Sequence, residues 1–381
     1  MSRPLLHVVR SLNPSDGGPA EVVRQLCLAH AALGISTEVV TLDPPDAPWL
    51  AKWPSPVHAL RGRGGYGWTS ALGPWLQARA KDFAGVFIHG LWQWQGAGVW
   101  RALRGGGTPY YIFPHGMLDP WFRQAWPLRH ARKALYWRAV EHRVVRDAEA
   151  VIFTAEDERR LGRDTFRPWQ PKHEAVIPLG VAGAPELDPG TLRERFLARF
   201  PALRGERLLL FLGRLHEKKG CDLLLEAFRR VAPPLHLVFV GPCADEGFAE
   251  RLRRLADGLP VTFASPLYGD DKWAALAAAD AFILPSHQEN FGMAVVEALA
   301  SGVPVLVSDK VNIWREIVED GAGFAEADTV DGAARLLEKW MAADRIAMCK
   351  RAKECYIQRF DIRRTAAGLA AITTLTKPTT P

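Results

Sequence analysis

The segment PSHQENFGMAVVEALASGVPV, residues 285–305, contains the pattern that decides the fold. The apolar run at residues 281–284 precedes it and predicts a buried strand of a parallel sheet. Residues 292–300 predict a helix that ends at Gly302, and residues 304–307 predict the next strand. The order strand, turn, helix, strand indicates an α/β fold built on parallel sheets.

Two glutamates lie on this unit, Glu289 in its turn and Glu297 in its helix. Eight residues at about 1.5 Å each separate them by roughly 12 Å along the helix axis, the scale of one sugar with its diphosphate. Carboxylates accept hydrogen bonds from hydroxyl groups, which sugars present in pairs. The spacing therefore predicts that the two carboxylates bind the two ends of one ligand. The alternative is that Glu289 only caps the helix and Glu297 is a solvated helix residue.

The pattern Glu-x7-Glu, set within Pro-Ser-x-x-Glu-x-Phe-Gly and followed by Val-Glu-Ala-Leu-Ala-Ser-Gly-Val-Pro-Val, resembles the retaining glycosyltransferases of family 4. The resemblance implies that Glu289 lies at the donor sugar and that Glu297 binds the ribose. It also implies that the turn of Asn290, Phe291 and Gly292 gives backbone N–H groups to the sugar. The family usually has a small residue where this chain has Asn290, a departure that bears on donor choice.

A second turn, Gly-Arg-Leu-His-Glu-Lys-Lys-Gly at residues 213–220, follows another predicted strand. Arg214 and Lys219 flank this turn, where a diphosphate fits, because Arg offers a bidentate fork and Lys a compact charge. The pattern resembles family 4, which implies that both cations hold the diphosphate; a solvated basic turn is the alternative. The resemblance also implies that the loops at Gly241 and Leu267 bind the donor. The loop at Leu267 would hold the nucleobase largely through backbone groups.

Near the N-terminus, a strand predicted at residues 5–11 leads through Gly17 and Gly18 to a helix predicted at residues 20–33. A glycine turn before a helix can cradle a phosphate, although a bare Gly-Gly pair is more often only a tight turn. It is not the Gly-x-Gly-x-x-Gly dinucleotide fingerprint. Its position matches the glycine loop of family 4, so the resemblance places Gly17 and Gly18 beside the donor phosphates.

Two histidines follow predicted strands of the first half: His89 ends the strand at residues 85–89, and His115 follows the strand at residues 110–113. In an open α/β sheet, ligands bind beyond the carboxyl ends of the strands, so both histidines are candidates. A lone histidine is more often structural. His115 matches a family 4 histidine at the reaction centre, and its catalytic role is implied by that resemblance, whereas His89 has no such match.

The chain has 381 residues, enough for two domains with cores of their own. The strand–helix alternation runs twice along the chain and favours two doubly wound sheets. We expect an N-terminal acceptor-side Rossmann-like domain, residues 1–182 with a C-terminal helix at 361–376, and a C-terminal nucleotide-sugar-binding domain, residues 183–360. The resemblance implies the GT-B fold, in which two such α/β domains face each other across a cleft and the last helix crosses back to the first domain.

Positive charge and tryptophan concentrate in the first half. Residues 1–182 hold 22 Lys and Arg against 15 Asp and Glu, and 11 of the 14 Trp. Residues 122–146 predict a basic helix, broken near Pro127. Basic residues and Trp suit the headgroup region of an anionic membrane, so we expect contact with its inner face; an ordinary surface helix is the alternative. No nucleic-acid motif accompanies the patch, and no nucleic-acid partner is expected.

No apolar run approaches the ~18 residues that span a bilayer. The five cysteines fit neither a disulfide framework nor a zinc site. Both observations favour a cytoplasmic location, with any membrane contact peripheral.

These residues and the resemblance predict a retaining, metal-independent hexosyltransferase. It would move a hexose from a nucleotide diphosphate sugar to a glycan or lipid-linked acceptor, in cell-surface polysaccharide or lipopolysaccharide biosynthesis. The expected catalytic set is His115, Arg214, Lys219 and Glu289, with the two cations neutralising the departing diphosphate. No Asp-x-Asp pair appears, and neither a metal nor another cofactor is expected. The alternatives are an epimerase or glycan phosphorylase of the same fold, and a catalytically silent sugar-nucleotide-binding partner of a polysaccharide assembly complex.

Overall fold

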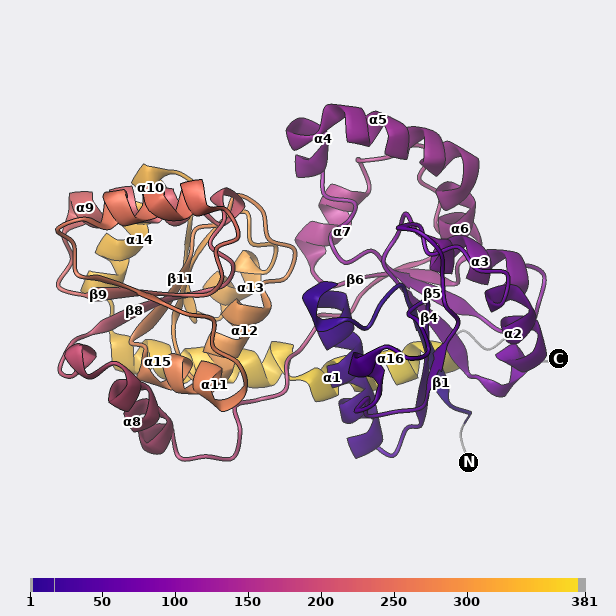
Figure 1. Cartoon of the computed structure of the whole chain (residues 1–381), viewed down its shortest axis with the longest axis horizontal. Helices are drawn as coiled ribbons and strands as arrows, with labels where there is room; N and C mark the ends of the chain where they lie inside the picture. Colours follow the sequence, from indigo (N-terminus) through magenta and orange to yellow (C-terminus); the bar gives the residue numbers. More distant parts are fainter. Residues whose placement is uncertain (1–2, 17, 376–381) are drawn as a thin grey trace. The chain divides into compact units, whose positions relative to one another are not determined.

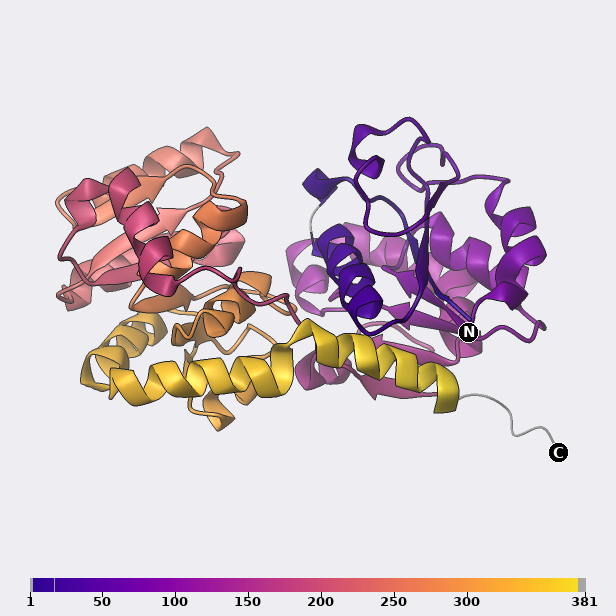
Figure 2. The same cartoon turned by 90° about the horizontal axis from the view of Figure 1, so that it is seen from below.

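The computed structural model describes residues 3–16 and 18–375. The chain forms two compact units: unit 1 comprises residues 1–182 with the segment from residue 362 onward, and unit 2 comprises residues 183–361. Each unit is built on one sheet of parallel strands with helices on both faces (Figure 1 and Figure 2). The two Rossmann-like, doubly wound units predicted from the sequence are confirmed.

The seven-stranded sheet of unit 1 has the order β3-β2-β1-β4-β5-β6-β7, and all neighbouring strands are parallel. The strand order reverses between β1 and β4, which is where ligands bind in open α/β sheets. The strands are β1 (Leu5–Val9), β2 (Thr37–Thr41), β3 (Val57–Ala59), β4 (Gly85–His89), β5 (Tyr110–Phe113), β6 (Ala150–Phe153) and β7 (Glu174–Val176).

Helices cover this sheet, and α1 and α16 lie side by side although they come from opposite ends of the chain (Figure 1). The helices of unit 1 are α1 (Gly18–Ala32), α2 (Leu72–Arg79), α3 (Trp94–Leu103), α4 (Trp121–Ala125), α5 (Pro127–Tyr136), α6 (His142–Asp147), α7 (Glu156–Gly162) and α16 (Ile362–Leu375). The N-terminal strand is shorter than predicted, ending at Val9, and the first helix begins two residues earlier than predicted, at Gly18.

The basic segment predicted as one helix over residues 122–146 is divided, and the break near Pro127 is confirmed. α4 ends at Ala125 and α5 begins at Pro127, because proline fits the first turn of a helix but not its interior. The sequence did not predict the π-helical turn Trp137–Glu141 that joins α5 to α6. Such turns are rare and occur often at functional sites.

Unit 2 has a six-stranded parallel sheet in the order β10-β9-β8-β11-β12-β13. Its strands are β8 (Leu208–Leu212), β9 (His236–Val240), β10 (Val261–Ala264), β11 (Ala281–Leu284), β12 (Val305–Ser308) and β13 (Gly323–Glu326). Its helices are α8 (Pro189–Arg199), α9 (Cys221–Val231), α10 (Glu246–Ala256), α11 (Gly269–Ala278), α12 (Met293–Ala300), α13 (Trp314–Glu319), α14 (Val330–Ala342) and α15 (Arg345–Cys355).

The central strands are buried on both faces, which explains why they read as continuous apolar runs in the sequence. Every residue of β1, β4, β5 and β6 is buried in unit 1, as is every residue of β11 and β12 in unit 2. In unit 1 the register pairs Val9 with His89, and His89 with Phe113. The loops that follow β1, β4 and β5 therefore start from one edge of the sheet.

Candidate active site

A row of three histidines, joined by hydrogen bonds, runs from inside the sheet of unit 1 to its carboxyl edge. His7 Nδ1 on β1 lies 2.9 Å from His89 Nε2 at the end of β4, and His89 Nδ1 lies 2.9 Å from His115 Nε2 after β5. We call these residues the histidine row. His115 and His89 were predicted from the sequence, but His7 was not, because a polar residue inside an apolar strand gives no signal of its neighbours.

All three imidazoles are held neutral near pH 7. Burial lowers the pKa of His115 to about 4, and burial together with His30 lowers the pKa of His7 to about 3. Burial also holds the pKa of His89 well below its ordinary value, with smaller contributions from the other two histidines. Each neutral ring has one N–H group and one acceptor nitrogen.

Two proton arrangements satisfy both links of the histidine row. In one, the N–H groups point toward His115, whose Nε2 accepts and whose Nδ1 carries the proton. In the other, His115 Nε2 donates and its Nδ1 becomes an acceptor. The row can therefore present His115 Nδ1 as either a donor or an acceptor without forming a buried charge.

The backbone around His115 is strained and firmly held. His115 has φ +50°, a left-handed conformation that non-glycine residues seldom adopt. The next N–H group, of Gly116, donates to Glu158 Oε1 at 2.6 Å, and the N–H of Thr154 donates to Glu158 Oε2 at 2.6 Å. The buried carboxylate of Glu158 thus fixes the loop after β5, as strained functional residues require. Glu158 was not predicted from the sequence.

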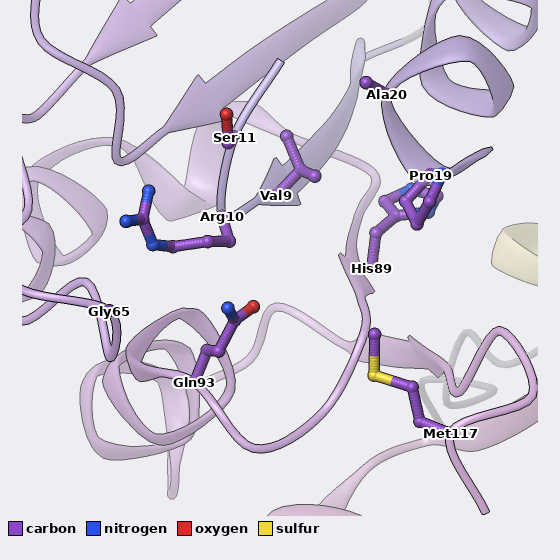
Figure 3. Close-up of a pocket in the computed structure, with 9 residues that line it drawn as sticks. All are labelled: Val9, Arg10, Ser11, Pro19, Ala20, Gly65, His89, Gln93 and Met117. Carbon is purple, nitrogen blue, oxygen red and sulfur yellow. The ribbon is translucent and has the colours of Figure 1, made fainter. Parts of the chain in front are cut away.

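A pocket of about 380 Å³ opens beside the histidine row, at the carboxyl ends of β1 and β4 (Figure 3). Figure 3 shows the side chains of Arg10, Gln93, Met117 and His89 around the opening. The lining residues are Val9, Arg10, Ser11, Pro19, Ala20, Gly65, His89, Gln93 and Met117.

Arg10 gives this pocket its positive charge. It forms no ion pair in the described part of the chain, and its Nη2 donates to the carbonyl oxygen of Gly64 at 3.2 Å. Its Nε atom is buried without a hydrogen-bond partner. A buried unpaired donor costs free energy unless a ligand or water meets it, so the pocket suits an oxygen-rich ligand.

In unit 2, Lys219 and Glu289 form an ion pair. Two contacts to the carbonyl oxygen of Lys218 tie the loop after β8 to the loop after β11: the N–H of His287 donates at 2.8 Å and Ser286 Oγ at 2.9 Å. Both members of the pair were candidates from the sequence, but their contact was not predicted. It places a cation and a carboxylate together at the carboxyl edge of the sheet.

The two candidate cations of unit 2 differ in their surroundings. Burial, then the charges of Lys218 and Arg214, lower the pKa of Lys219, whereas the paired carboxylate of Glu289 favours the charged ammonium. Arg214 is exposed and makes no ion pair within residues 3–16 and 18–375. It lines a pocket of about 330 Å³ that also contacts His216 and Phe248, so its guanidinium is available to an anion.

Glu297 is buried on α12, and its Oε1 accepts a hydrogen bond from Lys272 Nζ at 2.6 Å. The alternative that Glu297 is a solvated helix residue is therefore wrong. The alternative that Glu289 caps the helix is also wrong, because Gly292 is the N-cap and no side chain caps α12. Lys272, which lies on α11, 25 residues before its partner, was not predicted from the sequence.

The turn before α12 can reach a ligand mainly through its backbone. Phe291 is buried against Phe360, and Asn290 Oδ1 accepts a hydrogen bond from the Asn312 side chain at 3.3 Å. Gly292 has φ +76°, which favours glycine at this position.

The remaining donor candidates lie in loops or at a helix start. A Cβ on Gly241 would lie 1.9 Å from the carbonyl oxygen of Gly213, so the loops after β8 and β9 approach too closely for any side chain there. Leu267 is buried in the loop after β10. Gly18 begins α1, with open space around its Cβ position, and Gly17 lies outside the described residues.

The described residues contain neither a candidate metal cluster nor a candidate membrane-spanning helix. No group of three His, Cys, Asp or Glu side chains there is placed to hold a metal ion. None of the helices in those same residues is long and apolar enough to cross a membrane.

Both halves of the chain match models of known protein families. Residues 193–356 match "Glycosyl transferases group 1", and residues 17–180 match "Glycosyl transferase 4-like domain". Among curated proteins, the chain is 33% identical over 196 residues to the D-inositol 3-phosphate glycosyltransferase of Geodermatophilus obscurus, covering 48% of this chain and 42% of that protein. It is 34% identical to the sulfoquinovosyl transferase SQD2 of Arabidopsis thaliana, over 34% of this chain and 26% of that protein.

Such matches span only part of the curated relatives, from 26% to 59% of their lengths. The fold extends further: the structure of Alr3699/HepE from Anabaena, solved in complex with UDP and glucose, matches 98% of this chain and 100% of that chain. The TM-score is 0.75 at 17% sequence identity, which shows a shared fold.

Proposed function

This chain belongs to the glycosyl transferases of group 1, and we propose that it moves a hexose from a nucleotide diphosphate sugar to a hydroxyl group of a glycan or lipid-linked acceptor, with retention at the anomeric carbon. The observation that carries the proposal is the contact between Lys219 and Glu289, beside the exposed Arg214, in the unit that matches the group 1 model. A cation that can bind the diphosphate and a carboxylate that can bind the sugar hydroxyls thus lie together at the carboxyl edge of the sheet of unit 2.

The chemistry assigned to unit 2 is electrostatic. As the bond from the sugar to the diphosphate breaks, negative charge grows on the leaving group, and Arg214 and Lys219 stabilise it. Glu289 orients the donor sugar and favours the charged form of Lys219, while Glu297, held by Lys272, accepts hydrogen bonds from the ribose. With two cations for the diphosphate, the proposed reaction is independent of added metal.

Unit 1 is assigned to the acceptor. The pocket of Figure 3 offers the guanidinium of Arg10 and the ring of His89, and His115 completes the histidine row next to it. The name D-inositol 3-phosphate glycosyltransferase describes a relative that acts on an anionic acceptor, and the positive charge of this unit suits an acceptor of that kind. We place the reaction in the cytoplasm, at the inner face of an anionic membrane, within cell-surface polysaccharide or lipopolysaccharide biosynthesis.

A thermal-shift screen against UDP, GDP and ADP sugars identifies the donor, and release of the nucleoside diphosphate then tests turnover. NMR of the first product should show the anomeric configuration of the donor, and EDTA should leave the rate unchanged. Binding without turnover or slow hydrolysis would support a silent sugar-nucleotide-binding protein instead. An inverted product, or activity restored only by a divalent metal, would contradict the proposed mechanism.

A further inference from the structure

A second cavity of unit 1, of about 160 Å³, lies beneath α4 and α5 and shares Met117 with the pocket of Figure 3. Its volume is well above the ~15 Å³ that one water molecule needs. Phe122 and Trp126 stack on one another with ring centroids 5.7 Å apart, and Phe166 stacks on His130 at 4.6 Å. Aromatic rings thus form the walls. α4 and α5 follow one another at the edge of unit 1 in Figure 1.

Three basic side chains line this cavity: Arg129, His130 and Lys133, all on α5. The guanidinium of Arg129 lies 5.4 Å from the centroid of the Trp126 ring, and Lys133 Nζ lies 4.8 Å from the ring of Trp92. Within the part of the chain that the structure describes, none of the three forms an ion pair with a carboxylate. Cations above aromatic faces are attracted to them, but the rings do not neutralise their charge.

Two acids lie near these basic side chains. Asp119 is the acid that lines the cavity, and its Oδ1 accepts the N–H of Trp121 at 2.8 Å, at the start of α4. Burial raises the pKa of Glu141 to about 8, so this carboxyl group is neutral at pH 7. Burial and then Arg129 lower the pKa of Lys133, and these two effects outweigh the opposing effect of Glu141.

We propose that this cavity binds a phosphoryl group carried by the acceptor. The Arg129 guanidinium gives a fork of N–H donors, Lys133 gives a compact charge, and His130 adds a ring N–H, a set that matches the several oxygens of a phosphate better than a single hydroxyl. The aromatic walls pack against the apolar faces of the group that bears the phosphate. Met117 adjoins both cavities, so one acceptor reaches from the phosphate subsite to the histidine row.

The acceptor role rests on the proposed function, but phosphate binding does not, and a site-resolved test separates the two. The intact chain is treated with acetic anhydride at pH 8, with and without inorganic phosphate, and lysine acetylation is measured by mass spectrometry. A bound anion raises the pKa of a contacting lysine by about one unit or more, so acetylation of Lys133 should slow at least roughly tenfold. In the same samples, acetylation of Lys219 shows whether the anion binds unit 2. Acetylation of the exposed Lys350 shows effects of phosphate that are not specific to one site.

Two neighbouring arginines give a matched pair of variants. Arg129→Gln removes a charge that lines the cavity and should raise the phosphate concentration for half-protection of Lys133 roughly tenfold. Arg132→Gln removes the same charge from an exposed position outside the cavity and should leave protection unchanged. Equal losses in both variants would overturn the subsite, because they would show a general charge effect. Protection of Lys219 but not Lys133 would overturn it while leaving the donor assignment intact.

The phosphate can belong to a soluble molecule or to a lipid, and the same measurement distinguishes them. Protection of Lys133 by glucose 1-phosphate, with no further protection by vesicles, assigns the subsite to a soluble phosphorylated acceptor. Protection only by phosphatidylcholine vesicles that contain phosphatidic acid, abolished in Arg129→Gln and retained in Arg253→Gln, at an exposed position on α10 of unit 2, assigns it to a lipid phosphate. Unchanged acetylation of Lys133 under all of these conditions would refute the proposal.

Discussion

His89 Nδ1 lies 2.9 Å from His115 Nε2, and the two rings stack with their centroids 5.2 Å apart. Because the other nitrogen of His89 contacts His7, the ring of His89 holds the orientation of His115 and couples the tautomer of His115 to that of His7. His89 and His7 are therefore positioning residues for His115. His89 and His7 reach His115 only because β1 and β4 lie side by side in the folded sheet.

The first prediction tests this positioning. His89→Phe keeps a ring between Phe113 and His115 but removes both links, so His115 Nε2 loses its partner and the tautomer of His115 is no longer coupled to that of His7. We expect kcat to fall at least roughly tenfold, equivalent to ~1.4 kcal/mol, with the donor KM nearly unchanged. Steady-state kinetics with circular dichroism as a folding control measures this. A variant with wild-type kcat and an unchanged pH profile would show that the histidine row is only structural.

The second prediction concerns acid stability. The pKa of a buried histidine is lower in the folded chain than in the unfolded chain, so its contribution to stability is complete above pH 6.5. That contribution is lost as the pH falls toward about 4 for His115 and about 3 for His7. Each such histidine removes up to ~1.4 kcal/mol per pH unit in that window.

Denaturant unfolding at pH 7, 5.5 and 4.5 measures the loss. His7→Phe should flatten the decline between pH 6.5 and 4.5 by up to ~3 kcal/mol, whatever its effect at pH 7. An identical slope in the variant would mean that His7 is protonated in the folded chain, or that the row opens in acid.

The third prediction uses Glu141, which has the opposite dependence. Its Oε1 accepts the N–H of Trp92 at 3.3 Å and its Oε2 is buried without a partner. The folded pKa is raised from 4.5 to about 8, so the unfolded chain releases its proton first, and stability falls as the pH rises between these values. Glu141→Gln should have little effect near pH 4.5 and should stabilise unit 1 by up to ~5 kcal/mol near pH 8.5. Denaturant unfolding of the wild type and the variant at both pH values measures this. If the substitution changes the free energy of unfolding equally at both pH values, the raised pKa of Glu141 is refuted.

Much of the fold could be predicted because local patterns determine it. The buried strands are recognisable in the sequence as continuous apolar runs. The final helix, α16, spans residues 362–375 as its composition indicates. Pro127 stops one helix and starts another for a reason that lies in the proline ring itself. The π-helical turn after α5 has no such local signal, and its buried Trp137 stacks on Phe166 and Trp169, which are distant in the sequence.

The candidate site likewise contains residues that could be predicted from the sequence and contacts that could not. Motif residues such as Arg214 and Glu289 were identifiable because they sit in patterned turns. Their surroundings were not, because they arise from contacts between distant segments. Lys272 meets Glu297 across 25 residues, and Glu158 holds Gly116 across 42. Burial decides which charges are paired and which histidines are neutral, and burial is a property of the whole fold.

The fourth prediction tests the diphosphate cations. Lys219→Met or Arg214→Ala should lower kcat/KM by on the order of 10² or more, as expected when charge stabilisation of a transition state is lost. Lys218→Met removes the same charge from the adjacent residue and keeps the backbone carbonyl oxygen that accepts hydrogen bonds from Ser286 and His287. We expect less than a few-fold loss for this control. Comparable losses in Lys218→Met and Lys219→Met would refute a specific role for Lys219.

The fifth prediction concerns the outer face of α5. Leu128 and Leu135 are 82% and 72% exposed, and because they are seven residues apart they share a face with the exposed Arg132 between them. Trp126, at the start of the helix, is also exposed. Exposed apolar residues flanked by basic ones suit the headgroup region of an anionic membrane, where each basic residue contributes about 1 kcal/mol.

Flotation with vesicles tests this face apart from the cavity beneath it. The chain should float with phosphatidylglycerol vesicles at low salt but not with phosphatidylcholine vesicles, because the attraction is screened beyond a Debye length of roughly 10 Å at 0.1 M salt. Arg132→Glu with Arg138→Glu should abolish flotation, and Leu128→Ala with Leu135→Ala should weaken it. Arg253→Glu with Arg254→Glu, at exposed positions on α10 of unit 2, makes an equal change in net charge and should leave flotation intact. If both charge reversals act alike, net charge rather than α5 governs binding. If the wild-type chain stays with the soluble fraction on anionic vesicles at low salt, the membrane assignment is wrong and a soluble acceptor is favoured.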